Sequence, residues 1–166
     1  MFKFCPYCSN LLGSLKKDDK TIPFCKKCGK PIYQHTPQTA ACILLNKNGE
    51  ILLVKRKNDP FMGLWSLPAG FVEYGENPIN AGLRELMEET NIKAEYDHVV
   101  GIYLADDHPK TYSILTVIKV KNTKGKLIFS DDATDCKYFN PNKLPKMAFK
   151  AQIKAIKDYL MFPNAS

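Results

Sequence analysis

The sequence WSLPAGFVEYGENPINAGLRELMEETNI, residues 65–92, decides the fold of this chain of 166 residues. Asn77 can cap a helix, and Pro78 suits the first helical position because the amide hydrogen it lacks has no helical partner there. Apolar residues then recur at helical spacing and predict a face that packs on a core: Ile79, Leu83 and Leu86. The stretch therefore predicts a loop followed by an amphipathic helix.

The same helix carries three glutamates on a second face. Glu85, Glu88 and Glu89 are spaced three and four residues apart, so their carboxylates share one side of the helix and repel one another. A divalent cation such as Mg²⁺, which takes oxygen ligands, would offset that repulsion. Arg84 can orient a carboxylate, and the loop before the helix can add the backbone oxygen of Gly70. The alternative is a plain acidic surface helix, but the crowded spacing favours the metal site.

These residues resemble the Nudix box, whose pattern is G-x5-E-x7-R-E-U-x-E-E-x-G-U, where U is an aliphatic residue. Gly70 and Glu76 take the first two fixed positions, and residues 84–92 (RELMEETNI) take the rest. One position departs from the pattern, because Asn91 stands where the family has its last glycine. Asparagine is the next best residue in the left-handed conformation that ends many helices, so we expect the turn to form.

The resemblance to the Nudix hydrolase family implies an α/β/α sandwich with a mixed sheet. It also implies hydrolysis of a nucleoside diphosphate linked to another group, assisted by Mg²⁺ or Mn²⁺. The positions that match the family's metal ligands are Glu85, Glu88, Glu89 and the Gly70 carbonyl, and Arg84 matches the arginine that orients the glutamates.

The general base stays open between two places. One of Glu85 and Glu88 can take the proton from the attacking water, but a carboxylate in contact with a cation cannot easily do both. The alternative is Asp132 or its neighbour Asp135, in an acidic loop that resembles one found late in the family's domain. A solvated turn is the competing interpretation of that loop.

The substrate is less determined than the chemistry. Side chains that could contact a base or flavin are three aromatic residues and one histidine beside two aspartates: Phe61, Trp65, Tyr103 and His108. We expect the substrate to be ADP-ribose, NADH or an FAD-like dinucleotide. Residues 103–110 (YLADDHPK) do not contain the Ser-Gln-Pro-Trp-type motif of NADH pyrophosphatases, which weakens NADH. The alternatives are a nucleoside triphosphate, capped RNA, or a nucleotide sensor without activity, although intact glutamates argue against a sensor.

Four of the six cysteines form two pairs, Cys5 with Cys8 and Cys25 with Cys28, separated by sixteen residues. This spacing is typical of a four-cysteine zinc site. A segment of about 34 residues with few apolar side chains cannot normally fold by burial alone, so zinc would supply much of its stability. Zinc ribbons also occur in one subgroup of the Nudix family. Two disulfides or a redox-active pair are the alternatives.

The basic charge is concentrated in this cysteine-rich segment. Residues 1–37 carry +5 of the net charge of +7. Its lysines could contact nucleic-acid phosphates, but few aromatic residues accompany them for base stacking, so we favour a solvated surface. A dimerising role, and hence a homodimer, stays open. The start of the chain, MFKFCPYC, lacks the apolar run of a signal peptide, and no segment is long enough to span a bilayer. We therefore expect a reducing, cytoplasmic location and no membrane contact.

The pattern along the chain predicts a zinc ribbon at 1–34, a linker at 35–38 and a Nudix domain at 39–162. Alternation and β-branched residues predict strands within the domain at 39–45, 50–56, 94–103, 111–120, 126–129 and 136–139. A second helix is predicted at 146–161. The two remaining cysteines, Cys42 and Cys136, lie in apolar stretches and are expected in the core.

Overall fold

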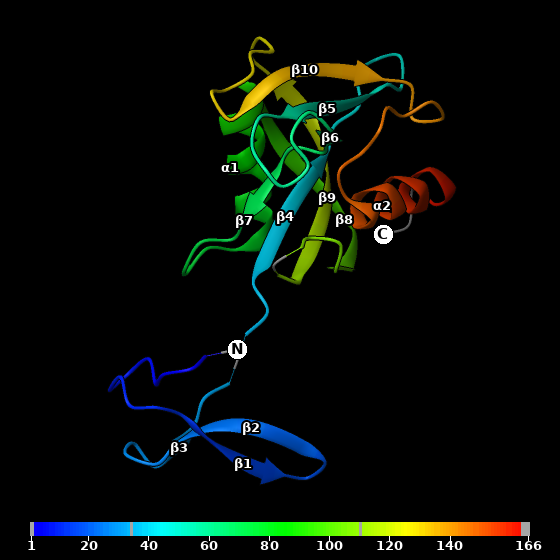
Figure 1. The fold of residues 1–166 in the computed structure, drawn as a ribbon. Helices are drawn as coiled ribbons and strands as arrows, with labels where there is room; N and C mark the ends of the chain where they lie inside the picture. Colours follow the sequence, from blue (N-terminus) through cyan, green and yellow to red (C-terminus); the bar gives the residue numbers. More distant parts are fainter. Residues whose placement is uncertain (1, 34, 110, 164–166) are drawn as a thin grey trace. The chain divides into compact units, whose positions relative to one another are not determined.

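The computed structural model describes residues 2–33, 35–109 and 111–163 (Figure 1). The chain divides into two compact units, Met1–Thr36 and Pro37–Ser166. The division lies inside the segment predicted as a linker, whereas the predicted end of the ribbon at residue 34 lies outside the described residues. Within the described ranges, no helix has both the length and the apolar composition needed to cross a bilayer.

The first unit contains one small antiparallel sheet. Its strands are β1 (Gly13–Lys17), β2 (Lys20–Cys25) and β3 (Lys30–Pro31), in the order β1-β2-β3. The buried side chains of this unit are Cys5, Cys25 and Ile32, which form a cluster with Cys8, Leu12 and Cys28 at its edge. The cysteines are therefore most of its core, as expected for a segment too short to fold by apolar burial.

The second unit is built on two sheets. A four-stranded sheet has the order β7-β4-β9-β8, from β4 (Gln38–Ile43), β7 (Ala69–Phe71), β8 (Lys93–Ala105) and β9 (Ser113–Lys124). Strands β4 and β9 pair in parallel and the other neighbours pair antiparallel, so this sheet is mixed. An antiparallel sheet has the order β10-β5-β6, from β5 (Ile51–Arg56), β6 (Trp65–Ser66) and β10 (Ala133–Phe139).

Two helices cover opposite faces of the four-stranded sheet, because alternate residues of a strand point to opposite sides. One set packs in a core cluster with α2 (Lys150–Met161): Ala41, Ile43, Leu115, Val117, Ala155 and Ile156. The other set packs with α1 (Pro78–Thr90): Cys42, Leu44, Leu86, Ile118 and Val120. Figure 1 shows the sheet between α1 and α2, which confirms the predicted α/β/α sandwich. Cys42 and Cys136 are both buried, as predicted.

Helix α1 begins and ends at the predicted residues. The Asn77 side chain accepts a hydrogen bond from the backbone N–H of Ile79 at 2.7 Å, and Pro78 is the first helical residue. At the other end, Asn91 has a φ of 57° and its backbone N–H donates to the carbonyl oxygen of Met87 at 2.8 Å. Asparagine therefore takes the left-handed position that the Nudix pattern gives to glycine.

The prediction of a strand at 126–129 is wrong, because these residues form no strand. The backbone N–H of Ile128 donates to the Thr90 carbonyl at 3.0 Å, and that of Ser130 donates to the Glu89 carbonyl at 3.2 Å. The last carbonyls of a helix have no partner within the helix, and this segment satisfies two of them instead of extending a sheet. These two hydrogen bonds bring the acidic loop at 130–132 to the C-terminal end of α1.

Candidate active site

Arg84 is the centre of a charge network on α1. Its Nη1 donates to Glu85 Oε1 at 2.7 Å and to Glu88 Oε2 at 3.0 Å. Its Nε and Nη2 donate to the two carboxylate oxygens of Glu76, both at 2.9 Å, and Nη2 also donates to the Phe71 carbonyl at 3.0 Å. One guanidinium therefore joins the glutamate helix to the loop that precedes it, in the fork geometry that arginine offers to carboxylates.

Glu76 belongs to the scaffold of that loop. Its Oε2 accepts a hydrogen bond from the backbone N–H of Glu73 at 3.0 Å, in addition to those from Arg84. The hydrogen bond from Arg84, followed by that from the Glu73 backbone, holds the pKa of Glu76 below its usual range. Its carboxylate is thus ionised and engaged in holding the loop.

Gly70 and Glu85 are in close contact. A β-carbon built on Gly70 would lie 2.1 Å from Glu85 Oε1, far inside van der Waals contact. Only glycine therefore allows the carboxylate to lie against the backbone of β7. Burial at this position raises the pKa of Glu85, although the hydrogen bond and charge of Arg84 oppose that rise.

Glu89 is the most desolvated of the three glutamates. Its Oε2 accepts a hydrogen bond from the backbone N–H of Ala69 at 3.0 Å. Burial raises the pKa of Glu89 to about 8, and the negative charges of Glu85 and Asp132 add to the effect. The positive charge of Arg56 acts in the opposite direction. A nearby cation would therefore favour the ionised form of this carboxyl strongly.

The donor set fits a hard divalent cation. Three carboxylates and the carbonyl oxygen of Gly70 are oxygen ligands, and the single arginine on their helix face cannot neutralise all three negative charges. Among the described residues, however, the glutamate oxygens do not gather as closely as the four cysteine sulfurs of the first unit. The Glu88 side chain is 57% exposed and that of Glu85 is 16% exposed, so Glu88 is the glutamate freer to move onto an ion.

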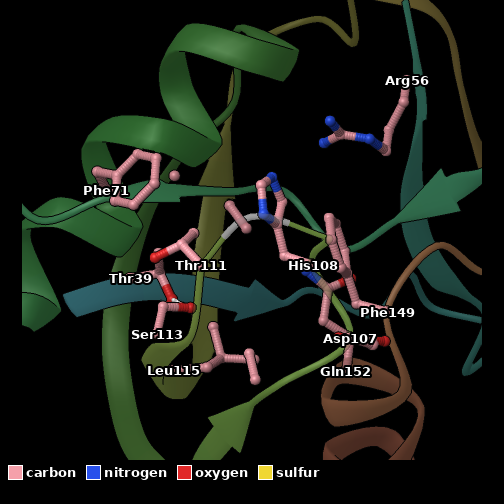
Figure 2. A pocket seen from close by; sticks show the side chains of 13 residues that line it. Thr39, Arg56, Phe71, Asp107, His108, Thr111, Ser113, Leu115, Phe149 and Gln152 are labelled. Carbon is pink, nitrogen blue, oxygen red and sulfur yellow. Dashed lines mark hydrogen bonds between the residues drawn. The ribbon is translucent and has the colours of Figure 1, made fainter. Parts of the chain in front are cut away.

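A cavity of about 170 Å³ lies beside this cluster and includes Gly70 in its wall (Figure 2). Its wall is mainly apolar with a few polar groups, the composition of small-molecule sites in general. The lining residues come from β4, β5, β7, β9, the end of β8 with the loop after it, and the start of α2: Thr39, Arg56, Ala69, Gly70, Phe71, Ala105, Asp107, His108, Thr111, Ser113, Leu115, Phe149 and Gln152.

The four residues predicted to contact substrate lie in different places. His108 lines the cavity. Phe61 is not a lining residue but makes an edge contact with one, Phe149, with ring centroids 5.4 Å apart. The other two are not among the lining residues either. Trp65 contacts the ring of Phe139, with centroids 4.6 Å apart, and the Tyr103 hydroxyl donates to Asp158 Oδ2 at 3.1 Å. The structure thus brings one of the four to the cavity wall.

No sequence motif pointed to Arg56, which lines this cavity and a second one of about 110 Å³. Its Nε donates to the Pro60 carbonyl at 3.0 Å, and its guanidinium lies 5.2 Å from the ring centroid of Phe149. The second cavity also includes Glu89 and Asp132 in its wall. The signal in the sequence was a lone arginine at the end of an apolar strand that precedes the glutamate helix.

The first unit contains a separate centre for a metal. The sulfur atoms of Cys5, Cys8, Cys25 and Cys28 all lie within 4.8 Å of one another, and all four are free thiols. Three sulfur pairs are 3.3, 3.5 and 3.9 Å apart. Tetrahedral zinc with sulfur at about 2.3 Å requires sulfur separations of about 3.8 Å. The cluster is therefore compatible with zinc and consistent with the predicted ribbon.

Comparison with known proteins agrees with this geometry. An ADP-ribose pyrophosphatase of Methanocaldococcus jannaschii is 40% identical over 134 residues, which are 80% of this chain and 78% of that protein. The NAD-capped RNA hydrolase NudC of Pseudomonas aeruginosa is 24% identical over 152 residues, which are 91% of this chain but only 52% of that protein.

The fold has a counterpart among solved structures. The crystal structure of a NUDIX hydrolase from Nitrosomonas europaea matches with a TM-score of 0.79 at 25% identity, over 97% of this chain and 92% of that one. The model of the NUDIX domain matches residues 35–159, which include every residue of the glutamate helix and of the cavity wall. The chain therefore belongs to the NUDIX domain family.

Proposed function

We propose that this protein is a metal-dependent pyrophosphohydrolase that cleaves ADP-ribose or a related dinucleotide such as NADH or FAD. The observation that carries the proposal is the contact of Glu85 with Gly70, because Gly70 also belongs to the wall of a cavity that includes Phe71 and Phe149. A pyrophosphate at the Gly70 end and a nucleoside in the cavity would suit that arrangement. The name of the archaeal relative, an ADP-ribose pyrophosphatase, supports the same substrate class.

Oxygen donors for Mg²⁺ or Mn²⁺ would be Glu85, Glu88, Glu89 and the Gly70 carbonyl. When bound, such a cation neutralises charge on the phosphates and lowers the pKa of a water molecule. Water attacks one phosphorus, the bridging P–O bond breaks, and ADP-ribose yields AMP and ribose 5-phosphate.

The protein's own side chains would perform three tasks in this reaction. Arg84 holds Glu85 and Glu88 in place through its hydrogen bonds. Glu88, the exposed glutamate, can take the proton of the attacking water where it does not itself contact the cation, and Asp132 is the alternative base where it does. Arg56 lies where its positive charge can face a substrate phosphate, because it lines the cavity on the side of Glu89.

The test is turnover of ADP-ribose by the full chain with Mg²⁺ and with Mn²⁺, followed by chromatography of the AMP released. The Glu88→Gln variant should fold normally, because this side chain is 57% exposed, and should lose activity by about 100-fold or more. The matched control is Glu95→Gln, which changes an exposed glutamate that accepts a hydrogen bond from Asn122 at a distance of 2.7 Å. Equal turnover by wild type and Glu88→Gln would contradict the proposed role of the glutamates.

A second candidate activity is hydrolysis of NAD-capped RNA. The likeness to the Pseudomonas aeruginosa NudC spans 91% of this chain and therefore extends into the cysteine-rich unit. Lysines of that unit, including Lys16, Lys17 and Lys20, could contact RNA phosphates. Turnover of NAD-capped RNA at least tenfold faster than that of free NAD, with a steep salt dependence, would favour this activity over the first.

A further inference from the structure

The two carboxylate oxygens of Asp107 lie in different environments. Its Oδ2 accepts a hydrogen bond from the backbone N–H of Lys150 at 2.6 Å. Lys150 is the first residue of α2, and the preceding residue, Phe149, provides no side-chain cap. Asp107, in the loop after β8, therefore caps α2 from a distant part of the chain, and a carboxylate suits the positive end of a helix.

The other oxygen, Oδ1, is buried. Among the described residues and their side chains, it is the buried side-chain polar atom without a hydrogen-bond partner. A buried acceptor left unpaired costs free energy, so a cavity-lining residue that carries such an atom points to a donor from a bound molecule. Asp107 is one of the residues that line the cavity beside the glutamates.

The position of Asp107 shows which part of a substrate it would meet. In Figure 2, Phe71 lies on the side of α1, whereas Asp107, Phe149 and Gln152 lie together at the start of α2. Gly70, next to Phe71 in β7, contacts Glu85, so the phosphates belong at that side of the cavity. The group that reaches Asp107 is then the nucleoside, and Phe149 offers an aromatic ring to a planar base.

Two other polar side chains of the cavity wall already make hydrogen bonds within the protein. Gln152 Oε1 accepts a hydrogen bond from the backbone N–H of Leu67 at 2.8 Å. The Thr39 hydroxyl donates to Ser113 Oγ at 3.3 Å. Asp107 Oδ1 therefore remains as the buried acceptor that can still take a hydrogen bond from a bound base.

We propose that Asp107 determines base specificity, with Oδ1 accepting a hydrogen bond from the exocyclic amino group of adenine. This inference rests on the proposed function, because it assigns the nucleoside end of the same cavity. Hypoxanthine carries a carbonyl oxygen in place of that amino group, and an oxygen facing Oδ1 would leave both acceptors without a hydrogen. The protein should therefore prefer adenosine nucleotides over inosine nucleotides.

The variant Asp107→Asn tests this assignment by reversing the hydrogen-bonding pattern. The amide oxygen of asparagine must accept from the Lys150 N–H, so its NH₂ group takes the place of Oδ1 and offers a donor. The helix cap is kept, whereas the preferred base changes from adenine to hypoxanthine. A residue that served only as a helix cap would not change the choice between two ligands in this way.

The experiment compares the full-length wild type with Asp107→Asn and with Asp106→Asn, a matched change at the exposed neighbour. Titrations measure the Kd of AMP and of IMP, and assays with Mg²⁺ measure kcat/KM for ADP-ribose and IDP-ribose. Wild type and Asp106→Asn should favour the adenine ligand by about tenfold or more, and Asp107→Asn should favour the hypoxanthine ligand.

An unchanged ratio in Asp107→Asn would overturn the inference, including the case in which both ligands weaken equally because Asp107 meets a ribose hydroxyl. Failure of both AMP and IMP to bind would overturn it as well. The proposed function can fail while this inference stands. In that case AMP binds in preference to IMP and Asp107→Asn reverses the preference, but neither ADP-ribose nor IDP-ribose is hydrolysed.

Discussion

Gly70 of β7 lies against the carboxylate of Glu85 of α1, so closely that a β-carbon at residue 70 would be 2.1 Å from Glu85 Oε1. The same oxygen accepts a hydrogen bond from Arg84 Nη1 at 2.7 Å. The glycine at the start of the Nudix pattern thus leaves the space into which a glutamate of the helix fits. Loop and helix are matched in shape as well as in charge.

The variant Gly70→Ala should lose activity more than stability. The added methyl group displaces the flexible end of Glu85, which can move, so the free energy of unfolding should fall by only about 1–2 kcal/mol. If Glu85 binds the cation as proposed, displacement of its carboxylate by about 1 Å should lower kcat/KM about 100-fold. Gly13→Ala is the control, because its β-carbon would meet only atoms at 3.8 Å or beyond. Full activity in a folded Gly70→Ala protein would contradict the role given to this contact.

Replacing Glu89 should change how stability depends on pH. The pKa of Glu89 is raised to about 8 by burial, so the folded state prefers the neutral carboxyl, and its contribution to stability is lost as pH rises from about 5 through 8. The Glu89→Gln substitution removes this pH-dependent loss of stability, because glutamine does not ionise. In buffer without added Mg²⁺ or Mn²⁺, the variant should become more stable than wild type by on the order of 3 kcal/mol above pH 8.

Urea unfolding at a series of pH values measures that difference. Titrating groups that do not interact with Glu89 behave alike in both proteins and cancel in the comparison, whereas Glu85 and Asp132 are coupled to Glu89. A difference in the free energy of unfolding that stays constant between pH 5 and pH 9 would show that Glu89 is not desolvated as described. Addition of Mg²⁺ should reduce the difference at high pH, because an ion in contact with the ionised carboxylate stabilises the wild type alone.

The cysteine cluster predicts a local effect of zinc loss. Cys25→Ser should reduce bound zinc from about one ion per chain to a small fraction, and hydrogen exchange in Met1–Thr36 should accelerate. Exchange in the second unit should stay slow, because each unit has its own core. Cys136→Ser should keep its zinc, since Cys136 packs with Val54 and Ala133 in the second unit. Wild-type protein with much less than one zinc per chain would contradict the ribbon.

Local signals were enough to predict helix α1. Its two ends depend on Asn77 and Asn91, whose conformations and capping hydrogen bonds involve residues within a few positions along the chain. The prediction of a loop at Ala69 and Gly70 was wrong, because β7 (Ala69–Phe71) pairs with β4 in the mixed sheet. The other three strands of that sheet were predictable in place, because their apolar residues form continuous or alternating runs. The ends of these strands were less accurate, since β8 and β9 continue beyond the predicted limits to Ala105 and Lys124.

The rest depends on contacts between distant residues. Residues 126–129 have the composition of a strand. Backbone N–H groups of this segment and of Ser130 instead donate to the carbonyls of Thr90 and Glu89 at the end of α1, and no local sequence pattern predicts these hydrogen bonds. Asp107 likewise meets Lys150 across 43 positions, and the cavity exists only because the loop after β8 and the start of α2 come together. Sequence patterns therefore predicted the glutamates, but not Arg56, Asp107 or Phe149.

The central claim is that Glu85, Glu88 and Glu89 hold a divalent cation at the mouth of the nucleotide cavity. Its most direct test is a crystal of the full chain grown with Mn²⁺ and the non-cleavable α,β-methylene analogue of ADP-ribose, measured for anomalous scattering. The account predicts a manganese peak at about 2.0–2.3 Å from carboxylate oxygens of these glutamates, between them and the analogue's phosphates. A bound analogue with no peak there, and with Glu85 and Glu88 still paired only with Arg84, would contradict it.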